Sequence, residues 1–117
     1  MSEAPFSVEI DLYSGMPNPV YSITKKDAEF LLKKIKTSEK DFRVSANHNL
    51  GYRGCILKIN NRKTLISNGG IFEMFGCNKK MKDKDNVLEI KILSLIKKHL
   101  HEKDIQSIKR SNKRLIF

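Results

Sequence analysis

The sequence predicts an α+β domain in which a largely antiparallel sheet of about five strands carries two helices on one face. Leu, Ile, Val and Phe make up 34 of the 117 residues, a share large enough to build a hydrophobic core. The predicted element order is β-β-α-β-β-β-α, in which strands follow one another as hairpins and do not alternate with helices. The length fits a single domain, residues 1–117, with an ordered core over about residues 6–102.

The first strand is predicted by strict alternation over residues 6–12, where Phe, Val, Ile and Leu occupy every second position. Residues 14–19, Ser-Gly-Met-Pro-Asn-Pro, end this strand. Their two prolines fix φ and remove N–H donors, while Gly and Asn tolerate positive φ. A second strand over residues 20–23 then completes a hairpin around a rigid loop.

A helix is expected to follow, over residues 24–36. Thr24 is a suitable N-cap, with Asp27 as its partner three residues later. Four apolar residues recur at helical spacing: Ala28, Leu31, Leu32 and Ile35. From residue 37 to 52 the pattern dissolves into polar residues, so this segment is the longest predicted loop.

Three more strands are predicted in the middle of the chain. Residues 55–59 alternate, and Asn60 and Asn61 suit a tight hairpin turn. Residues 62–67 form the returning strand. Asn-Gly-Gly at 68–70 is a further turn or bulge, and residues 71–75 form another apolar strand.

The C-terminal part is predicted to contain one helix after a polar connection. Residues 77–86 are rich in lysine, and Asp83 or Asp85 can cap the helix that follows. Apolar residues at spacings of three and four predict this helix over about residues 87–100. The tail at 103–117 is ambiguous, because its isoleucines could extend the helix and its apolar end must either dock or stay exposed.

The net charge of +10 comes from 23 basic and 13 acidic residues. Residues 1–60 carry 9 basic and 7 acidic groups, a net of +2, whereas residues 61–117 carry 14 and 6, a net of +8. Such an excess attracts an acidic protein or another polyanion, including nucleic acid. Of the 23 basic residues 18 are Lys, which favours loose attraction over specific reading of bases, because Arg is the preferred residue for bidentate recognition.

We expect neither a metal nor a cofactor. The two cysteines are too few for a disulfide scaffold and lack the paired spacing of a zinc site. His99 and His101 are two residues apart, so on a helix they cannot chelate one metal ion together. The chain contains no apolar run long enough to span a membrane and begins without a signal-peptide pattern. A cytoplasmic location is therefore expected, with export without a cleaved signal as the alternative.

Two segments resemble those of an uncharacterised family of small, mostly bacterial domains. The first runs from Val8 through the Ser-Gly-Met-Pro-Asn-Pro loop, and the second is Leu-Gly-Tyr-Arg-Gly at residues 50–54. The family carries an S-G-x-P-N-P loop after a strand and an L-G-Y-R-G segment that leads into a sheet. The similarity covers roughly residues 6–100. It implies a fold and no activity, and Met16 stands where Arg is expected in the family's loop.

The same two segments supply the candidate binding residues, which are Ser14, Asn18, Tyr52 and Arg53. A rigid loop loses little entropy on binding, but the same residue types also make a simple structural turn. Tyr52 and Arg53 suit stacking on a base or clamping a phosphate or carboxylate. Alternatively, Tyr52 packs on the sheet edge and Arg53 pairs with Asp11 or Glu9 as a structural tie.

The leading hypothesis is a non-enzymatic binding module for an acidic protein or other polyanion, which it contacts through its basic second half. The alternative is a small metal-independent ribonuclease, with Glu9 or Glu73 as base, His48 as acid and Arg53 on the phosphate. A third hypothesis is a nucleic-acid-binding protein without catalysis.

Overall fold

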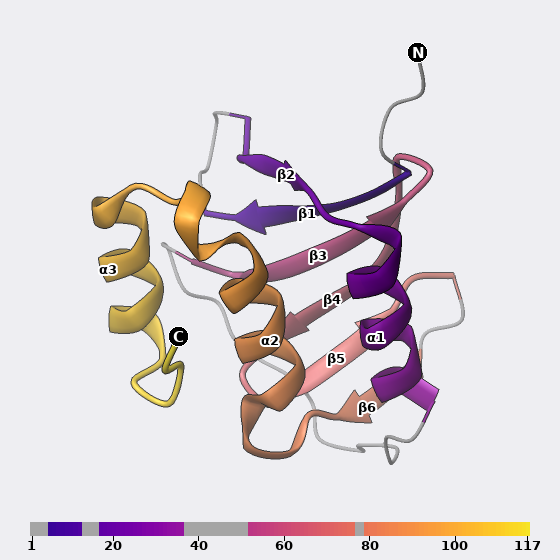
Figure 1. Ribbon diagram of the computed structural model, residues 1–117. Coiled ribbons are helices and arrows are strands. Elements are labelled where there is room, and N and C mark those ends of the chain that lie inside the picture. The colour runs from indigo at the N-terminus through magenta and orange to yellow at the C-terminus, as the bar shows by residue number, and fades with distance from the viewer. Residues whose placement is uncertain (1–4, 13–16, 37–51, 77–78) are drawn as a thin grey trace.

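The centre of the fold is a six-stranded antiparallel sheet in the order β2-β1-β3-β4-β5-β6 (Figure 1). The computed structural model describes residues 5–12, 17–36, 52–76 and 79–117. The strands are β1 (Phe6–Asp11), β2 (Val20–Ser22), β3 (Gly54–Ile59), β4 (Arg62–Asn68), β5 (Ile71–Met74) and β6 (Lys79–Lys82). The α-helices are α1 (Lys25–Lys36), α2 (Val87–Ile96) and α3 (Glu102–Ser111), and two short 3-10 helices lie at η1 (Lys84–Asn86) and η2 (Lys97–His99).

The two halves of the chain join along the pair β1 and β3. These strands are antiparallel, and their register runs from Phe6 opposite Ile59 to Asp11 opposite Gly54. Gly54 has φ +133°, and a Cβ on it would lie 2.9 Å from the carbonyl oxygen of Ser67. The position therefore requires glycine, because β4 approaches the start of β3 too closely for a side chain.

The predicted hairpin turn at Asn60 and Asn61 is confirmed. Both residues have positive φ, 51° and 64°, as expected for the two central residues of a type I′ turn between β3 and β4. Asn68 and Ile71 face each other across the next turn. These turns stack β3, β4 and β5 as a meander beside β1.

The hydrophobic core lies between the sheet and the helices. Figure 1 shows α1 and α2 across one face of the sheet, with α3 beside α2. The N–H of Asp27 donates to Thr24 Oγ1 at 3.1 Å, which confirms the predicted cap of α1. The fully buried residues come from both layers, among them Val8, Ile10, Leu31, Leu57, Leu65, Ile92, Leu93, Ile96 and Ile108. The predicted placement of helices on one face of an antiparallel sheet is thus confirmed.

The prediction of five strands missed β6, which lies within the segment expected to be a polar connection. β6 pairs with β5 from Ile71 opposite Lys82 to Met74 opposite Lys79. Three of its four residues are Lys, and Met81 packs against the core. The strand was missed because charged residues at a sheet edge, which discourage pairing with other chains, hide the apolar alternation.

The prediction of two helices missed α3. The α-helix that begins at Val87 ends at Ile96, earlier than expected, and is followed by η2. Leu100, with extended backbone angles of φ −81° and ψ 141°, then separates η2 from α3. Ile105 and Ile108 are buried on a separate helix and do not extend α2. The C-terminal segment also docks, since Leu115 is buried, while Ile116 is 79% exposed.

No helix in the described part of the chain is both long and apolar enough to cross a membrane.

Candidate functional site

The two sequence motifs meet where β1 ends and β3 begins. The backbone N–H of Arg53 donates to the carbonyl oxygen of Asp11 at 2.7 Å, one residue before the paired strand starts at Gly54. The N–H of Ile10 donates to the carbonyl oxygen of Pro19 at 3.0 Å, which holds residues 17–19, here called the proline loop, against β1. The pairing of β1 with β3 therefore brings together two segments that lie far apart in the sequence.

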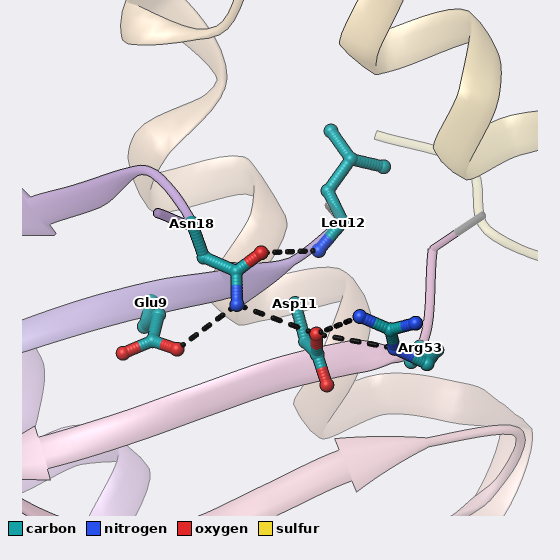
Figure 2. Close-up of polar contacts among 5 residues, drawn as sticks. All are labelled: Glu9, Asp11, Leu12, Asn18 and Arg53. Atoms are coloured by element: carbon teal, nitrogen blue, oxygen red, sulfur yellow. Dashed lines mark hydrogen bonds and ion pairs between the residues drawn. The ribbon is translucent and has the colours of Figure 1, made fainter. Parts of the chain in front are cut away.

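Asn18 fastens the proline loop to β1 through both ends of its amide (Figure 2). Its Oδ1 accepts a hydrogen bond from the N–H of Leu12 at 3.1 Å. Its Nδ2 donates to Glu9 Oε2 at 3.2 Å and to Asp11 Oδ1 at 3.3 Å. Asparagine suits this position because a single short side chain presents an acceptor and two donors.

Arg53, from the second motif, donates to Asp11 Oδ1, the oxygen that also accepts from Asn18. Its Nε and one terminal nitrogen donate to Asp11 Oδ1 at 3.2 and 2.8 Å, and Figure 2 shows Asp11 between Asn18 and Arg53. The hydrogen bonds and the charge of Asp11 raise the pKa of Arg53. We call Glu9, Asp11, Asn18 and Arg53 the motif junction. Its geometry is that of the structural tie expected as one of the two alternatives for Arg53.

The motif junction is partly exposed and continues along the sheet. The side chain of Arg53 is 32% exposed and that of Asp11 is 22% exposed. Lys58 Nζ lies 3.6 Å from Glu9 Oε1, and both of those side chains are more deeply covered. The cluster therefore links neighbouring strands by charge on the face of the sheet that α1 and α2 leave uncovered.

Tyr52 lies on the side of the chain opposite to the motif junction and is fully buried. Its hydroxyl donates to Glu89 Oε2, and a further hydrogen bond at 3.1 Å joins it to Cys55 Sγ. Burial and the nearby Cys55 and Glu89 raise its pKa. Tyr52 therefore has no exposed surface on which a ligand could stack, and its ring packs in the core.

Glu89 is the centre of a second polar group beneath the first turn of α2. Besides the hydrogen bond from Tyr52, its Oε1 accepts the N–H of Gly69 at 3.1 Å, so it joins α2 to the turn between β4 and β5. Burial raises the pKa of Glu89 to about 7, although these hydrogen bonds act in the opposite direction. Burial also raises the pKa of the Cys55 thiol.

Asp83 caps α2 beside Glu89, which confirms one of the two predicted caps. Its carboxylate accepts the N–H groups of Leu88 and Glu89 at 2.7 and 3.1 Å and the hydroxyl of Ser67 at 3.4 Å. Burial raises the pKa of Asp83 even so. We call Tyr52, Cys55, Ser67, Asp83 and Glu89 the buried carboxylate cluster. Because its groups are sealed in the core and bonded to one another, they cannot reach a solvent-borne substrate in this conformation.

The residues of the catalytic alternative do not converge within the described part of the chain. Glu9 and Glu73 share a face of the sheet, since Glu9 lies opposite Ile56, Ile56 opposite Ile66 and Ile66 opposite Glu73. Three strand spacings of ~4.8 Å put their backbones roughly 14 Å apart. Arg53 is held by Asp11. His48 and Ser14 lie outside the described residues, so their predicted roles stay predictions.

The remaining titratable side chains form no metal site among the described residues. His99 and His101 are both exposed. The ring of His99 stacks on Tyr21 with 6.0 Å between centroids.

Sequence reasoning missed Glu89, although its position carried a signal. Glu89 precedes Ile92 by three residues and Leu93 by four, so helical spacing places it on the buried face of α2. A carboxylate on an apolar face needs internal partners. Sequence reasoning also missed Phe30, which is 44% exposed on α1. Its signal was an aromatic residue outside the apolar stripe of that helix.

Comparison with known protein families, with curated proteins and with solved structures finds no match for this chain. The resemblance to the family with the S-G-x-P-N-P loop thus stays a prediction.

Proposed function

We propose that the protein is a non-enzymatic binding module whose partner is an acidic protein or another polyanion, bound on the helical side of the molecule. The observation that carries this proposal is the unequal burial of charge between Val87 and the C-terminus. This stretch contains eight basic residues, of which seven are exposed and Lys91 is half-buried. Of its three acidic residues, Glu89 and Asp104 are buried and only Glu102 is exposed. Folding therefore makes this surface more basic than the sequence alone implies.

Helix α1 adds to the same side. Five of its twelve residues are Lys, all exposed, against two acidic residues. Because α1 lies next to α2, lysines from the nearly neutral first half of the sequence extend the basic surface of the second half. The sequence prediction assigned the basic surface to the second half alone, and the arrangement of helices enlarges it.

The described chemistry favours binding over catalysis. The carboxylates with raised pKa values, Asp83 and Glu89, are bonded inside the buried carboxylate cluster. Among the described residues, 13 of the 19 exposed charged side chains are lysines. Lysine is a strongly hydrated point charge, so the expected binding is fast to form and strongly weakened by salt.

The proposal is tested by measuring binding of three fluorescent probes over a salt series: a Glu-rich peptide, single-stranded RNA and duplex DNA. A peptide with Gln in place of Glu is the uncharged control. We expect the Glu-rich peptide to bind at low salt, to be released as salt rises, and to bind much more tightly than its Gln counterpart. Cleavage of the RNA, or no binding of any of the three probes even at low salt, would overturn the proposal.

Two charge-reversal variants with equal net charge locate the surface. The first replaces Lys by Glu on the helical side, at Lys33, Lys91, Lys97 and Lys98. The second makes the same number of changes around the sheet, at Arg62, Lys63, Lys82 and Lys84. We expect only the first variant to lose its affinity for the Glu-rich peptide. Equal loss in both would mean that net charge and no particular surface governs binding, which contradicts the proposed location.

A further inference from the structure

Phe30 is an aromatic residue placed on the outer side of α1. The residues of α1 that face the core are Ala28, Leu31 and Ile35. Phe30 lies outside this stripe and is 44% exposed. Two ammonium groups lie over its ring, Lys91 Nζ at 5.0 Å from the centroid and Lys34 Nζ at 6.0 Å. An exposed ring is therefore flanked by cations from two helices, within the distance at which cation–π attraction acts.

The ring lies in a groove of about 620 Å³ to which both helices contribute. We call it the Phe30 groove, and it is lined by Lys26, Asp27, Glu29, Phe30, Leu32, Lys33, Lys36 and Lys91. Its volume lies within the range of roughly 300–1,000 Å³ typical of ligand sites, but the groove is open to solvent and does not enclose a ligand. The lining combines two apolar side chains with four lysines and two acidic residues. The groove thus offers an apolar contact surrounded by a net positive charge.

We propose that the Phe30 groove binds an acidic protein segment that carries a bulky apolar side chain, which contacts Phe30 while neighbouring carboxylates pair with the lysines. This inference rests on the proposed function and gives it a location and a partner chemistry. Charge complementarity selects the acidic segment, since Lys33 and Lys91 border the ring's groove from two different helices. The contact with Phe30, which binding would bury, supplies the affinity, because aromatic anchors at the centre of an interface carry most of its energy.

The same lining argues against nucleic acid in this groove. A base needs an open ring face for stacking, and at Phe30 lysine ammonium groups lie over the ring. Asp27 and Glu29 also line the groove and would repel a phosphate backbone. No Arg is among the lining residues, although Arg is the side chain that best matches phosphate geometry. Asp27 and Glu29 repel carboxylates as well, but the carboxylates of a peptide lie on separate side chains, each of which can approach one of the four lysines. An apolar side chain can also contact the ring at its edge, without stacking on its face.

The inference is tested with a set of three labelled peptides against the full chain. The first is Glu-rich with one central Leu, the second has Ser in place of that Leu, and the third has Gln in place of the Glu residues. We expect the first to bind about tenfold more tightly than either of the others, because it alone supplies both contacts. Equal affinity of the Leu and Ser peptides would overturn the groove as an apolar site.

Matched variants then place the peptide. Phe30→Ala is compared with Val87→Ala, which removes another apolar side chain of similar exposure, 45%, outside the groove. A double variant in the groove, Lys33→Glu with Lys91→Glu, is compared with a double variant outside it, Lys97→Glu with Lys98→Glu. Both change the charge by the same amount on the same side of the molecule. We expect Phe30→Ala to weaken binding of the Leu peptide about tenfold and to abolish its advantage over the Ser peptide. Val87→Ala should leave both unchanged.

The outcomes separate this inference from the proposed function. If Glu-rich peptides bind with the same affinity to Phe30→Ala and to the wild type, the groove is overturned while the acidic-partner function stands. If neither the Glu-rich peptides nor the nucleic acids bind, both are overturned, and if the nucleic acids alone bind, the inference is overturned while the polyanion-binding function stands. If RNA binds and loses affinity on Phe30→Ala, the groove is a nucleic-acid site and the inference is wrong. Thermal unfolding of each variant confirms that it is folded before binding is measured.

Discussion

The motif junction and the Phe30 groove differ in where their polar groups find partners. At the motif junction, Asp11 Oδ1 accepts hydrogen bonds from both Asn18 and Arg53. In the Phe30 groove, most of the lysines lie exposed around an exposed ring. The residues that stand out in the sequence are thus bonded to one another, whereas the surface suited to a partner consists of ordinary lysines and one phenylalanine.

The difference follows from what each region has to stabilise. The motif junction and the buried carboxylate cluster flank the same short segment, residues 52–55, on its two sides. They hold a loop, two strands and a helix together across long sequence separations, so their residue types are tightly constrained. The Phe30 groove lies on the outer side of a helix whose inner face already provides the packing. Substitutions in the two regions should therefore affect different properties, stability in the first and binding in the second.

The largest expected effect is the loss of the Tyr52 ring. Tyr52→Ala should lower the free energy of unfolding by about 3–5 kcal/mol, because it leaves a cavity and removes a partner of Glu89. Denaturant titration measures the change. Tyr52→Phe keeps the ring and should lose only about 1–2 kcal/mol, the cost of leaving the Glu89 carboxyl with one partner fewer. A loss below about 1 kcal/mol for Tyr52→Ala would contradict its place in the core.

The next effect is a pH dependence that Glu89 produces. Its pKa is raised from the ordinary glutamate value of 4.5, which applies to the unfolded chain, to about 7 in the folded protein. Between these values the folded protein holds a proton that the unfolded chain has released, so the free energy of unfolding falls as pH rises. The full loss is up to about 3 kcal/mol above pH 7, at 1.36 kcal/mol for each pKa unit.

Glu89→Gln isolates this dependence from the other titrating groups, because glutamine has no proton to release. As pH rises from about 4.5 to 7, the free energy of unfolding of the wild type should fall relative to that of Glu89→Gln. Asp83, whose pKa burial also raises, titrates in both proteins and largely cancels. Parallel stability curves for the two proteins would show that Glu89 is not the source.

A smaller loss of stability is expected at Asn18. Asn18→Ala removes hydrogen bonds to Glu9, Asp11 and Leu12 and should cost about 1–2 kcal/mol, because the groups it leaves are partly exposed. Asn18→Asp keeps an acceptor for Leu12 but places a third carboxylate beside two others. Its loss should therefore shrink at high salt, while that of Asn18→Ala should not. The same salt response for both variants would contradict the arrangement at the motif junction.

The smallest effect on stability is expected at Phe30. Phe30→Ala should change the free energy of unfolding by less than about 0.5 kcal/mol, because the side chain is exposed and its neighbours are lysines. Denaturant titration of Phe30→Ala and of Val87→Ala, each compared with the wild type, measures this change. A loss above about 1.5 kcal/mol would place Phe30 among the packing residues and remove the contrast between the two regions.

Much of the sheet could be predicted from local patterns. The alternation in residues 6–12, the turn at Asn60 and Asn61 and the cap at Thr24 all follow from short-range rules, and the structure agrees with them. β6 escaped prediction because its lysines conceal the core-packed residue Met81. The break before α3 escaped it because isoleucines with helical spacing continue beyond Leu100.

The site was only partly predictable. Pairing of Arg53 with Asp11 was one of two alternatives, and the choice between them depends on β3 lying next to β1, a contact between residues 42 positions apart. No local pattern determines which strands become neighbours. The burial of Tyr52 depends in the same way on α2 bringing Glu89 to it, 37 positions further along the chain. The Phe30 groove requires α1 and α2 to pack side by side, which is likewise not encoded in either helix alone.

The most direct test of the central claim is the affinity of the Glu-rich, Leu-containing peptide for Asn18→Ala and Phe30→Ala, measured at low salt under conditions in which both are folded. We predict that Asn18→Ala binds the peptide as the wild type does, although it is less stable, and that Phe30→Ala binds it about tenfold more weakly at unchanged stability. The opposite pattern, with binding lost at Asn18 and retained at Phe30, would place the functional surface at the motif junction and contradict the account.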